Sequence, residues 1–295
     1  MSWDAHELGG RPLFVWSPSD ASRAYPTVYV LHAHMRSARW WFNVDPFVPS
    51  YPEAIDSLAP QAVVVLADGW TDLGGGQWIG EHATYLRDEV VPFVDGAYPT
   101  TGLRGLQGKS SGGYGALVNA MERPDLFQAV AAHAPDALFE VTLAHGFPAA
   151  ARELRERFDG SLDAFWASFE GLHSPGDALI VELTAAARAF GDGSLPFDHH
   201  GRVLPAFESW LERDPVRLAA GHDEAVQSWR GVWLDAGRRD EYFLDLGASA
   251  LRDALLASGL PGERLHFELV DGGHGGMSHR YPLSLAWLVE RLQVA

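Results

Sequence analysis

A serine, an aspartate and a histidine occur in this chain in an order that could support nucleophilic catalysis. Ser110 lies at the centre of the run GKSSG at 108–112, which matches Gly-x-Ser-x-Gly. Asp240 and His274 follow it, each in a loop after an apolar run. A serine hydroxyl needs a neighbouring base, and that base needs an orienting acid. We therefore interpret Ser110 as a nucleophile, His274 as its base and Asp240 as the acid.

Other residues compete for the roles of base and acid. His279 is a rival base, but it lies near the start of the last predicted helix. Asp235 and Asp271 are rival acids, and Asp235 falls at a predicted strand end, where it could instead stabilise the turn. Gly-Gly pairs on both sides of His274 let its loop approach the serine without a Cβ clash, which favours His274 as the base.

The negatively charged tetrahedral intermediate that forms when a serine attacks an acyl carbon needs backbone N–H donors, each contributing roughly 3 kcal/mol. We expect Ser111, the residue after the nucleophile, to supply one donor. The loop after the apolar run 28–31 should supply the other, from His34 or, as second choice, from Met35. His32 and His34 form a His-x-His pair, but no third ligand clusters with them, so we predict no metal site.

Four residues are predicted to contact substrate: Lys109, Trp40, Trp78 and His199. Lys109 is the only lysine among the 22 basic residues and lies beside the candidate nucleophile, although a bias toward arginine would also explain it. Trp40 belongs to an aromatic run that could instead be core, and Trp78 ends a glycine-rich loop that could form part of the rim of the site. His199 lies in an Asp-His-His segment that could equally be a polar turn.

The pattern of apolar residues predicts which elements position these groups. Short apolar runs indicate buried strands, and helical patterns lie between them. The predicted strands are 13–16, 27–31, 62–66, 102–107, 129–132, 232–235 and 265–270, and the predicted helices are 85–94, 114–121, 244–257 and 283–292. This alternation indicates an α/β fold with a mostly parallel central sheet and helices on both faces. A sharp turn from strand to helix would hold Ser110 exposed above the sheet.

The segment 139–229 interrupts this alternation. It contains helical stretches at 149–158 and 178–190, irregular connections and many aromatic residues. An insertion at the carboxyl ends of parallel strands commonly forms a cap over the site. We therefore predict an α/β core from 1–138 and 230–295, with an inserted, mostly helical cap at 139–229. Most of its aromatic side chains should build the cap's own core.

Composition limits the classes of function. The chain has 295 residues, of which 47% are hydrophobic, as in a large globular protein. A net charge of −17 disfavours nucleic acid as a partner, and the absence of cysteine excludes disulfides and thiol nucleophiles. No apolar run is long enough to span a bilayer, and the N-terminal residues do not resemble a secretory signal. We expect a cytoplasmic protein without membrane contact, and a homo-oligomer remains open.

The run Gly108-Lys109-Ser110 also matches the end of a phosphate-binding loop. That motif requires a glycine at 103, where this chain has Leu103. Glycines after the serine would also weaken the helix N-terminus that should hold a phosphate. The sequence therefore disfavours nucleotide binding.

On these residues, the chain resembles the esterase branch of the α/β-hydrolases, which includes esterase D-like enzymes, enterochelin esterases and the antigen 85 mycolyltransferases. The resemblance covers nearly the whole chain and is carried by residues 30–34, 88–95, 108–117 and 273–274. It implies an α/β-hydrolase fold, a triad of Ser110, Asp240 and His274, and oxyanion donors at His34 and Ser111. Two positions depart from the family pattern: Ala33 replaces the usual glycine, and Lys109 stands where relatives often have histidine.

The sequence therefore predicts a serine esterase. It would cleave a small-molecule carboxylic ester through an acyl-enzyme, with no metal or organic cofactor. An acyltransferase would use the same intermediate and is the nearest alternative. A non-catalytic scaffold that only binds small molecules is a further alternative, which the presence of all three triad residues disfavours.

Overall fold

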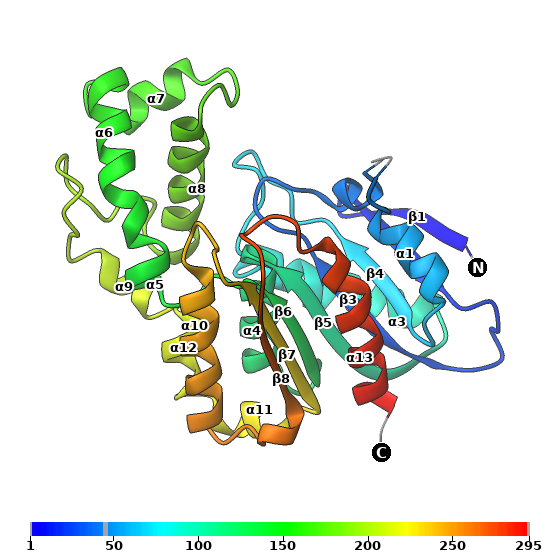
Figure 1. The fold of residues 1–295 in the computed structure, drawn as a ribbon. Coiled ribbons are helices and arrows are strands. Elements are labelled where there is room, and N and C mark those ends of the chain that lie inside the picture. Colours follow the sequence, from blue (N-terminus) through cyan, green and yellow to red (C-terminus); the bar gives the residue numbers. More distant parts are fainter. Residues whose placement is uncertain (1, 44–46, 294–295) are drawn as a thin grey trace.

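The computed structural model describes residues 2–43 and 47–293. Within these ranges the centre of the molecule is an eight-stranded sheet in the order β1-β2-β4-β3-β5-β6-β7-β8 (Figure 1). Its strands are β1 (Ser2–Leu8), β2 (Arg11–Ser17), β3 (Tyr25–Leu31), β4 (Val63–Ala67), β5 (Thr100–Lys109), β6 (Ala129–His133), β7 (Gly231–Gly237) and β8 (Leu265–Val270). Strands β4, β3, β5, β6, β7 and β8 run parallel. The prediction of a mostly parallel sheet is confirmed.

Strand β1 was not among the predicted strands. It pairs antiparallel with β2, and β2 in turn pairs antiparallel with β4. Gly9 and Gly10 form the two-residue connection between β1 and β2, and both have positive φ. A Gly-Gly pair between two alternating segments is a hairpin signal, and it could have revealed this edge strand from the sequence.

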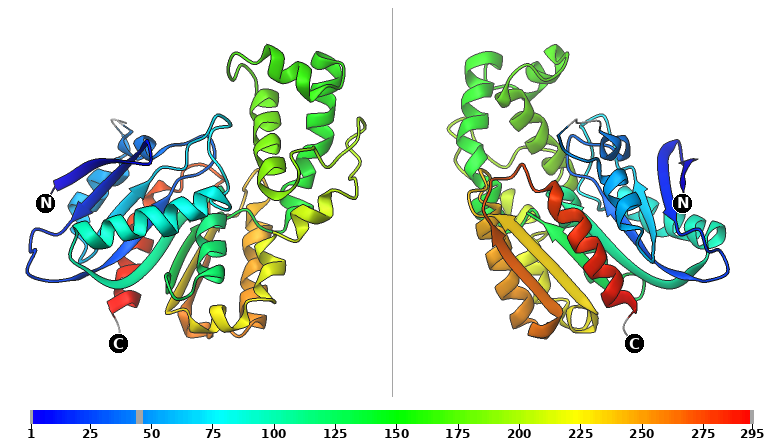
Figure 2. Two further views of the ribbon diagram at one scale, coloured as in Figure 1. Left: turned by 180° about the vertical axis from the view of Figure 1, so that it is seen from behind. Right: turned by 45° about the vertical axis from the view of Figure 1, so that its right-hand side comes forward.

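Helices cover both faces of the sheet (Figure 2). One face packs against η2 (Tyr85–Val90), α3 (Val91–Ala97), α4 (Ser111–Glu122) and α12 (Leu244–Ala257), and the other against α1 (Tyr51–Leu58) and α13 (Tyr281–Gln293). Side chains of a strand alternate between these layers. In β4, Val63 and Val65 join the first core cluster and Val64 and Leu66 join the second. No helix within the described ranges combines the length and apolar character needed to cross a bilayer.

The predicted insertion between β6 and β7 is helical. Its helices α6 (Phe147–Phe158), α7 (Leu162–Ser168) and α8 (Pro175–Phe190) form a lobe that stands above the carboxyl ends of the strands (Figures 1 and 2). Most of its aromatic residues pack in two clusters apart from the main core, and the larger of these also contains Tyr114 and Val118 of α4. By contrast Ala219, Val226 and Trp229 pack in the main core. The main core therefore resumes before residue 230, the predicted boundary.

A tight turn joins β5 to α4 at Ser110. The backbone of Ser110 has φ 55° and ψ −126°, a conformation that is strained for any residue other than glycine. Its N–H donates to the His133 carbonyl at 2.9 Å, which ties the turn to β6. A Cβ atom at Gly112 would lie 2.2 Å from the Leu31 carbonyl oxygen, so only glycine permits this approach of α4 to β3. The predicted strand, turn and helix are thus present around Ser110.

We predict that Gly112→Ala lowers the free energy of unfolding by about 3 kcal/mol or more, because backbone at Leu31 must move to admit the new Cβ. Gly96→Ala is the matched control, since Gly96 is exposed in α3 and a Cβ there meets no atom within 4 Å. The control should gain up to about 1 kcal/mol from helix propensity. Urea unfolding measures both values. If both variants changed the free energy of unfolding by a similarly small amount, the steric explanation of the turn would be contradicted.

Candidate active site

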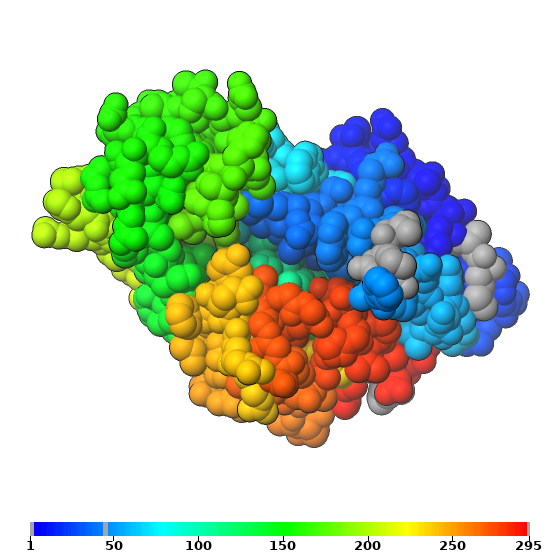
Figure 3. Space-filling view, turned by 45° about the horizontal axis from the view of Figure 1, so that its top comes forward, coloured from blue at the N-terminus to red at the C-terminus, as the bar shows by residue number. Residues whose placement is uncertain are grey.

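The candidate catalytic residues lie where parallel strands end. Ser110 follows β5, Asp240 follows β7 and His274 follows β8, and the loop that contains His34 follows β3. Carboxyl ends of parallel strands meet at one edge of a sheet, which is where ligands bind in such folds. Ser110, His34 and His274 line one cavity of about 340 Å³. Figure 3 shows the surface hollowed between the α6–α8 lobe and the orange to red C-terminal segment.

His274 is oriented by two acidic residues of the loop after β7. Its Nδ1 lies 2.9 Å from Oδ2 of Asp240, whose side chain is buried. The backbone N–H of Tyr242 donates to Oδ1 of Asp240, and the backbone N–H of His274 donates to Glu241. With Nδ1–H directed to Asp240, Nε2 of His274 is the nitrogen that can accept a proton.

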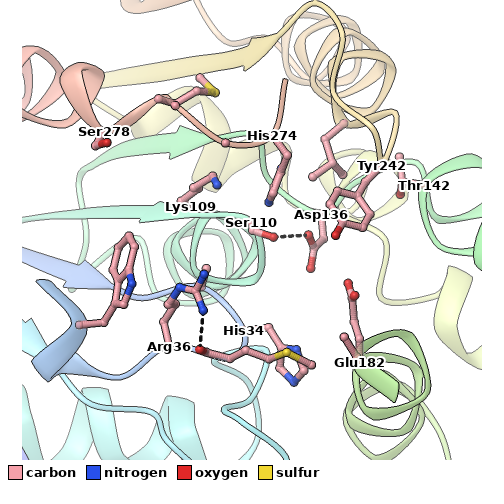
Figure 4. A pocket seen from close by; sticks show the side chains of 18 of the residues that line it. His34, Arg36, Lys109, Ser110, Asp136, Thr142, Glu182, Tyr242, His274 and Ser278 are labelled. Carbon is pink, nitrogen blue, oxygen red and sulfur yellow. Dashed lines mark hydrogen bonds between the residues drawn. The ribbon is translucent and has the colours of Figure 1, made fainter. Parts of the chain in front are cut away.

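Ser110 and His274 are not hydrogen-bonded to each other in this structure. The hydroxyl of Ser110 instead donates to Oδ1 of Asp136 at 3.3 Å. Figure 4 shows His274 on one side of Ser110 and Asp136 on another. Rotation about the Cα–Cβ bond of Ser110 changes the direction of its hydroxyl without moving the backbone.

Two acidic residues of the cavity were not predicted from the sequence. Asp136 follows β6, and Glu182 projects from α8 of the inserted lobe. Burial raises the pKa of Asp136 to about 6. Burial also raises the pKa of Glu182 to about 7, with a further contribution from the charge of Asp136. The position of Asp136 after a predicted strand was an available signal, whereas Glu182 depends on how the lobe lies over the sheet.

Backbone N–H groups are available where oxyanion donors were predicted. Within the described residues, no acceptor is found for the N–H of Ser111 or of His34, and Ser111 lies in the first turn of α4, where such groups are free. The N–H of Met35, the second choice, donates to the Gly74 carbonyl. The His34 ring hydrogen-bonds to the Leu73 carbonyl at 2.8 Å, and burial lowers the pKa of His34 to about 4. The neutral ring therefore anchors the loop.

The imidazole of His32 has a structural role. Its Nε2 accepts the N–H of Gly69 at 2.8 Å, and its Nδ1 lies 2.9 Å from the Ala33 carbonyl. Both ring nitrogens are therefore engaged with backbone, which leaves no lone pair directed toward a ligand.

The rival acid Asp235 belongs to a buried network beneath the site. Its Oδ1 lies 2.7 Å from Nδ1 of His133, and Nε2 of His133 lies 2.8 Å from the Ser284 hydroxyl. Arg280 and Trp233 both donate to the other oxygen of Asp235. The side chains of Asp235, His133 and Ser284 have no exposed surface, so this second Ser-His-Asp series is closed to substrate. It links β6, β7 and α13 and supports the carbonyl that binds Ser110.

The rival acid Asp271 and the rival base His279 lie at the surface. Asp271 pairs with the exposed side chain of Arg239. The exposed His279 directs its Nδ1 to the Gly276 carbonyl at 3.1 Å. Neither residue contacts Ser110 or His274 among the described hydrogen bonds.

Of the four predicted substrate contacts, Lys109 and Trp40 line the cavity. Trp78 does not, because its ring is buried in the main core against Gly115, and its Nε1 donates to the His32 carbonyl. His199 lies on the inserted lobe beside a separate cavity. The glycine-rich loop before Trp78 suggested exposure, but packing against α4 buries the ring.

We predict that Asp136→Asn stabilises the protein more at pH 8 than at pH 4.5. The pKa of Asp136 is about 6 in the fold against an ordinary value of 3.8. The protonated carboxyl therefore contributes stability in full below about pH 4, and this contribution is lost as the pH rises to about 6. Asparagine avoids that loss, of which about 2 kcal/mol falls between pH 4.5 and pH 8.

Chemical unfolding at both pH values measures the difference. Asp125→Asn is the control, because the exposed Asp125 is paired with Arg123, which lowers its pKa. This control should show no gain at pH 8. An equal effect of Asp136→Asn at both pH values would contradict the assigned burial of that carboxyl.

Comparisons with known proteins agree with this fold. The sequence matches the model of the family described as "Putative esterase" over residues 9–290. The structure is similar to a ferulic acid esterase, with a TM-score of 0.62 and 17% identity over 99% of this chain and 97% of that one. It is similar to an S-formylglutathione hydrolase from Agrobacterium tumefaciens, with a TM-score of 0.55 and 17% identity over 98% and 94% of the two chains.

A third similar structure is MPT51 of Mycobacterium tuberculosis, with a TM-score of 0.60 and 17% identity over 99% of this chain and all of that one (100%). At such identities structural likeness shows the fold alone, whereas the family match spans nearly the whole chain. The predicted resemblance is confirmed. The chain belongs to the Putative esterase family, has the α/β-hydrolase fold of that family and is a carboxylic-ester hydrolase.

Proposed function

We propose that the chain hydrolyses small carboxylic esters through a triad of Ser110, His274 and Asp240 and an acyl-enzyme intermediate. The observation that carries the proposal is the 2.9 Å hydrogen bond from the His274 ring to a buried Asp240, at a cavity that also holds Ser110 on a strained turn. A carboxylate so placed fixes the tautomer of the imidazole and stabilises its protonated form.

In the first step the Ser110 hydroxyl turns from Asp136 toward His274. Nε2 of His274 takes the hydroxyl proton while Oγ forms a bond to the acyl carbon. The bond from that carbon to the alcohol oxygen then breaks, and His274 returns the proton to the leaving alcohol. Water then attacks the serine ester while His274 takes a proton from it. The bond between the acyl carbon and Oγ breaks, His274 returns the proton to Oγ, and the carboxylic acid leaves.

The tetrahedral intermediates carry their charge on the former carbonyl oxygen. The backbone N–H groups of Ser111 and His34 are the proposed donors to this oxygen, since neither has an acceptor among the described residues. Donors held in place before the reaction stabilise the transition state more than the ground state. The proposed site thus supplies a nucleophile, a base, an orienting acid and two donors without a metal or organic cofactor.

Acyl transfer to an alcohol would use the same serine ester. The observation that keeps it as a second candidate is a cavity of about 340 Å³ with polar side chains on both sides of Ser110, which has room for an acceptor. Added acceptor alcohol would separate the candidates, because transfer yields a new ester where hydrolysis yields only the acid. We favour hydrolysis.

We predict that Ser110→Ala reduces kcat for a short para-nitrophenyl ester by four or more powers of ten. A fluorophosphonate should add its mass to the wild-type chain at Ser110 and should not label the variant. Ser111→Ala is the matched control, since it keeps the backbone N–H and should retain labelling. Peptide mapping by mass spectrometry reads the site of modification. Label at Ser111, or full activity without Ser110, would contradict the assignment.

We predict that Asp240→Asn impairs catalysis, whereas Asp235→Asn impairs stability. Asp240→Asn should lower kcat by about four powers of ten, because asparagine favours the wrong tautomer of His274. Asp235→Asn should instead lower the free energy of unfolding by about 3 kcal/mol, because it removes a buried partner of Arg280 and His133. Steady-state kinetics and urea unfolding of both variants provide the comparison. The reverse pattern would assign the catalytic acid to Asp235.

A further inference from the structure

Lys109 presents a positive charge to the cavity without a carboxylate partner. The side chain is half-buried beside Ser110, and no ion pair or hydrogen bond joins its ammonium group to a residue that the structure describes. Burial lowers the pKa of Lys109, Asp240 opposes this effect, and the nearby Arg36 guanidinium lowers the pKa further. An ammonium group in this setting would be stabilised by an anion placed in the cavity.

Arg36 is a second cation at the same side of the cavity. It lies on the loop after β3, and its guanidinium donates to the carbonyl of Met35 and lies 5.1 Å from the centre of the Trp40 ring. Within the described ranges it has no carboxylate partner. The remaining donors of the guanidinium form a planar fork that suits the two oxygens of a carboxylate or phosphate.

The charges of the cavity are separated across Ser110. Figure 4 shows Lys109 and Arg36 on one side of the serine and Asp136 and Glu182 on the other. The chain has 39 acidic and only 22 basic residues, yet neither of these two cavity-lining cations has a carboxylate partner among the residues that the structure describes. An anionic group would be attracted to the first side and repelled from ionised carboxylates at the second.

We infer that the natural substrate is an ester bearing an anionic group, a carboxylate or a phosphate, which Lys109 and Arg36 bind beside the scissile bond. The inference rests on the proposed function and specifies its substrate class. Lys109 and Arg36 then determine specificity, and the reaction itself remains that of Ser110 and His274. The anionic group belongs to either the acyl or the alcohol part of the ester, and the experiment distinguishes them.

Two matched pairs of esters test the inference. The acyl pair is mono-para-nitrophenyl adipate, which is anionic, and para-nitrophenyl hexanoate, which is neutral. The alcohol pair is para-acetoxybenzoate, which is anionic, and para-acetoxybenzamide, which is neutral. For one pair, we expect kcat/KM of the anionic member to exceed that of the neutral member by roughly tenfold or more, as for a hydrogen bond to a charged partner.

Variants then show whether the two cations cause the preference. Lys109→Gln and Arg36→Gln should each reduce the anionic-to-neutral ratio by roughly tenfold, because each removes one charge that binds the anion. Lys109→Arg should preserve most of the ratio. Arg123→Gln is the matched control, since Arg123 follows the far end of α4 and pairs with Asp125, and it should leave the ratio unchanged.

The outcomes separate this inference from the proposed function. If the neutral esters are hydrolysed and neither anionic ester is preferred, the inference is overturned while the hydrolase function stands. A preference that survives in both glutamine variants also overturns it. If the wild-type enzyme cleaves no member of either pair, the proposed hydrolysis fails and the inference fails with it.

Discussion

The left-handed backbone at Ser110 is the constraint on which the site depends. A serine tolerates φ 55° only where its surroundings leave no alternative. Here α4 approaches β3 so closely that Gly112 has no room for a Cβ, and β6 accepts the Ser110 N–H through the His133 carbonyl. The turn thereby places the hydroxyl at the cavity and leaves the N–H of Ser111 without an acceptor among the described residues. One strained residue thus provides the proposed nucleophile and positions a proposed oxyanion donor.

A buried polar network supports that turn from below. Asp235, His133 and Ser284 form a hydrogen-bonded series that connects β7, β6 and α13, and Arg280 balances the carboxylate. Every group in it is paired, as burial of charge requires. The same three residue types thus occur twice at this end of the sheet. Of the two series, only the proposed triad has members that line the cavity, Ser110 and His274, so access rather than residue type separates it from its structural counterpart.

Groups of opposite charge lie on opposite sides of the cavity, an arrangement that the sequence did not reveal. Asp136 and Glu182 have raised pKa values because burial disfavours their charged forms, and Lys109 has a lowered pKa for the same reason. These opposite shifts occur in one cavity, on opposite sides of Ser110. Such a site favours a substrate that places its negative charge on the side of Lys109, away from Asp136 and Glu182. This preference is the basis of the anionic substrate class that we infer.

The sequence predicted the features that follow from strand order and local pattern. Ser110, Asp240 and His274 could be grouped because each follows a strand and the carboxyl ends of parallel strands converge. Glu182 could not be predicted, because its place in the cavity depends on how the lobe packs over the sheet. Trp78 was predicted as a substrate contact from its glycine-rich loop, yet tertiary packing against Gly115 buries it. Trp229, the last residue of the predicted insertion, packs with the main core, a tertiary contact that the sequence pattern does not show.

The central claim is that acyl groups pass through a covalent bond to Ser110, and acid quenching during turnover of an acetyl ester tests it most directly. Mass spectrometry of the quenched chain locates any acetyl group by peptide mapping. We expect a single acetyl group on Ser110 that disappears when the ester is consumed. Continued turnover with no acetylated residue, or with acetyl on a different residue, would contradict it.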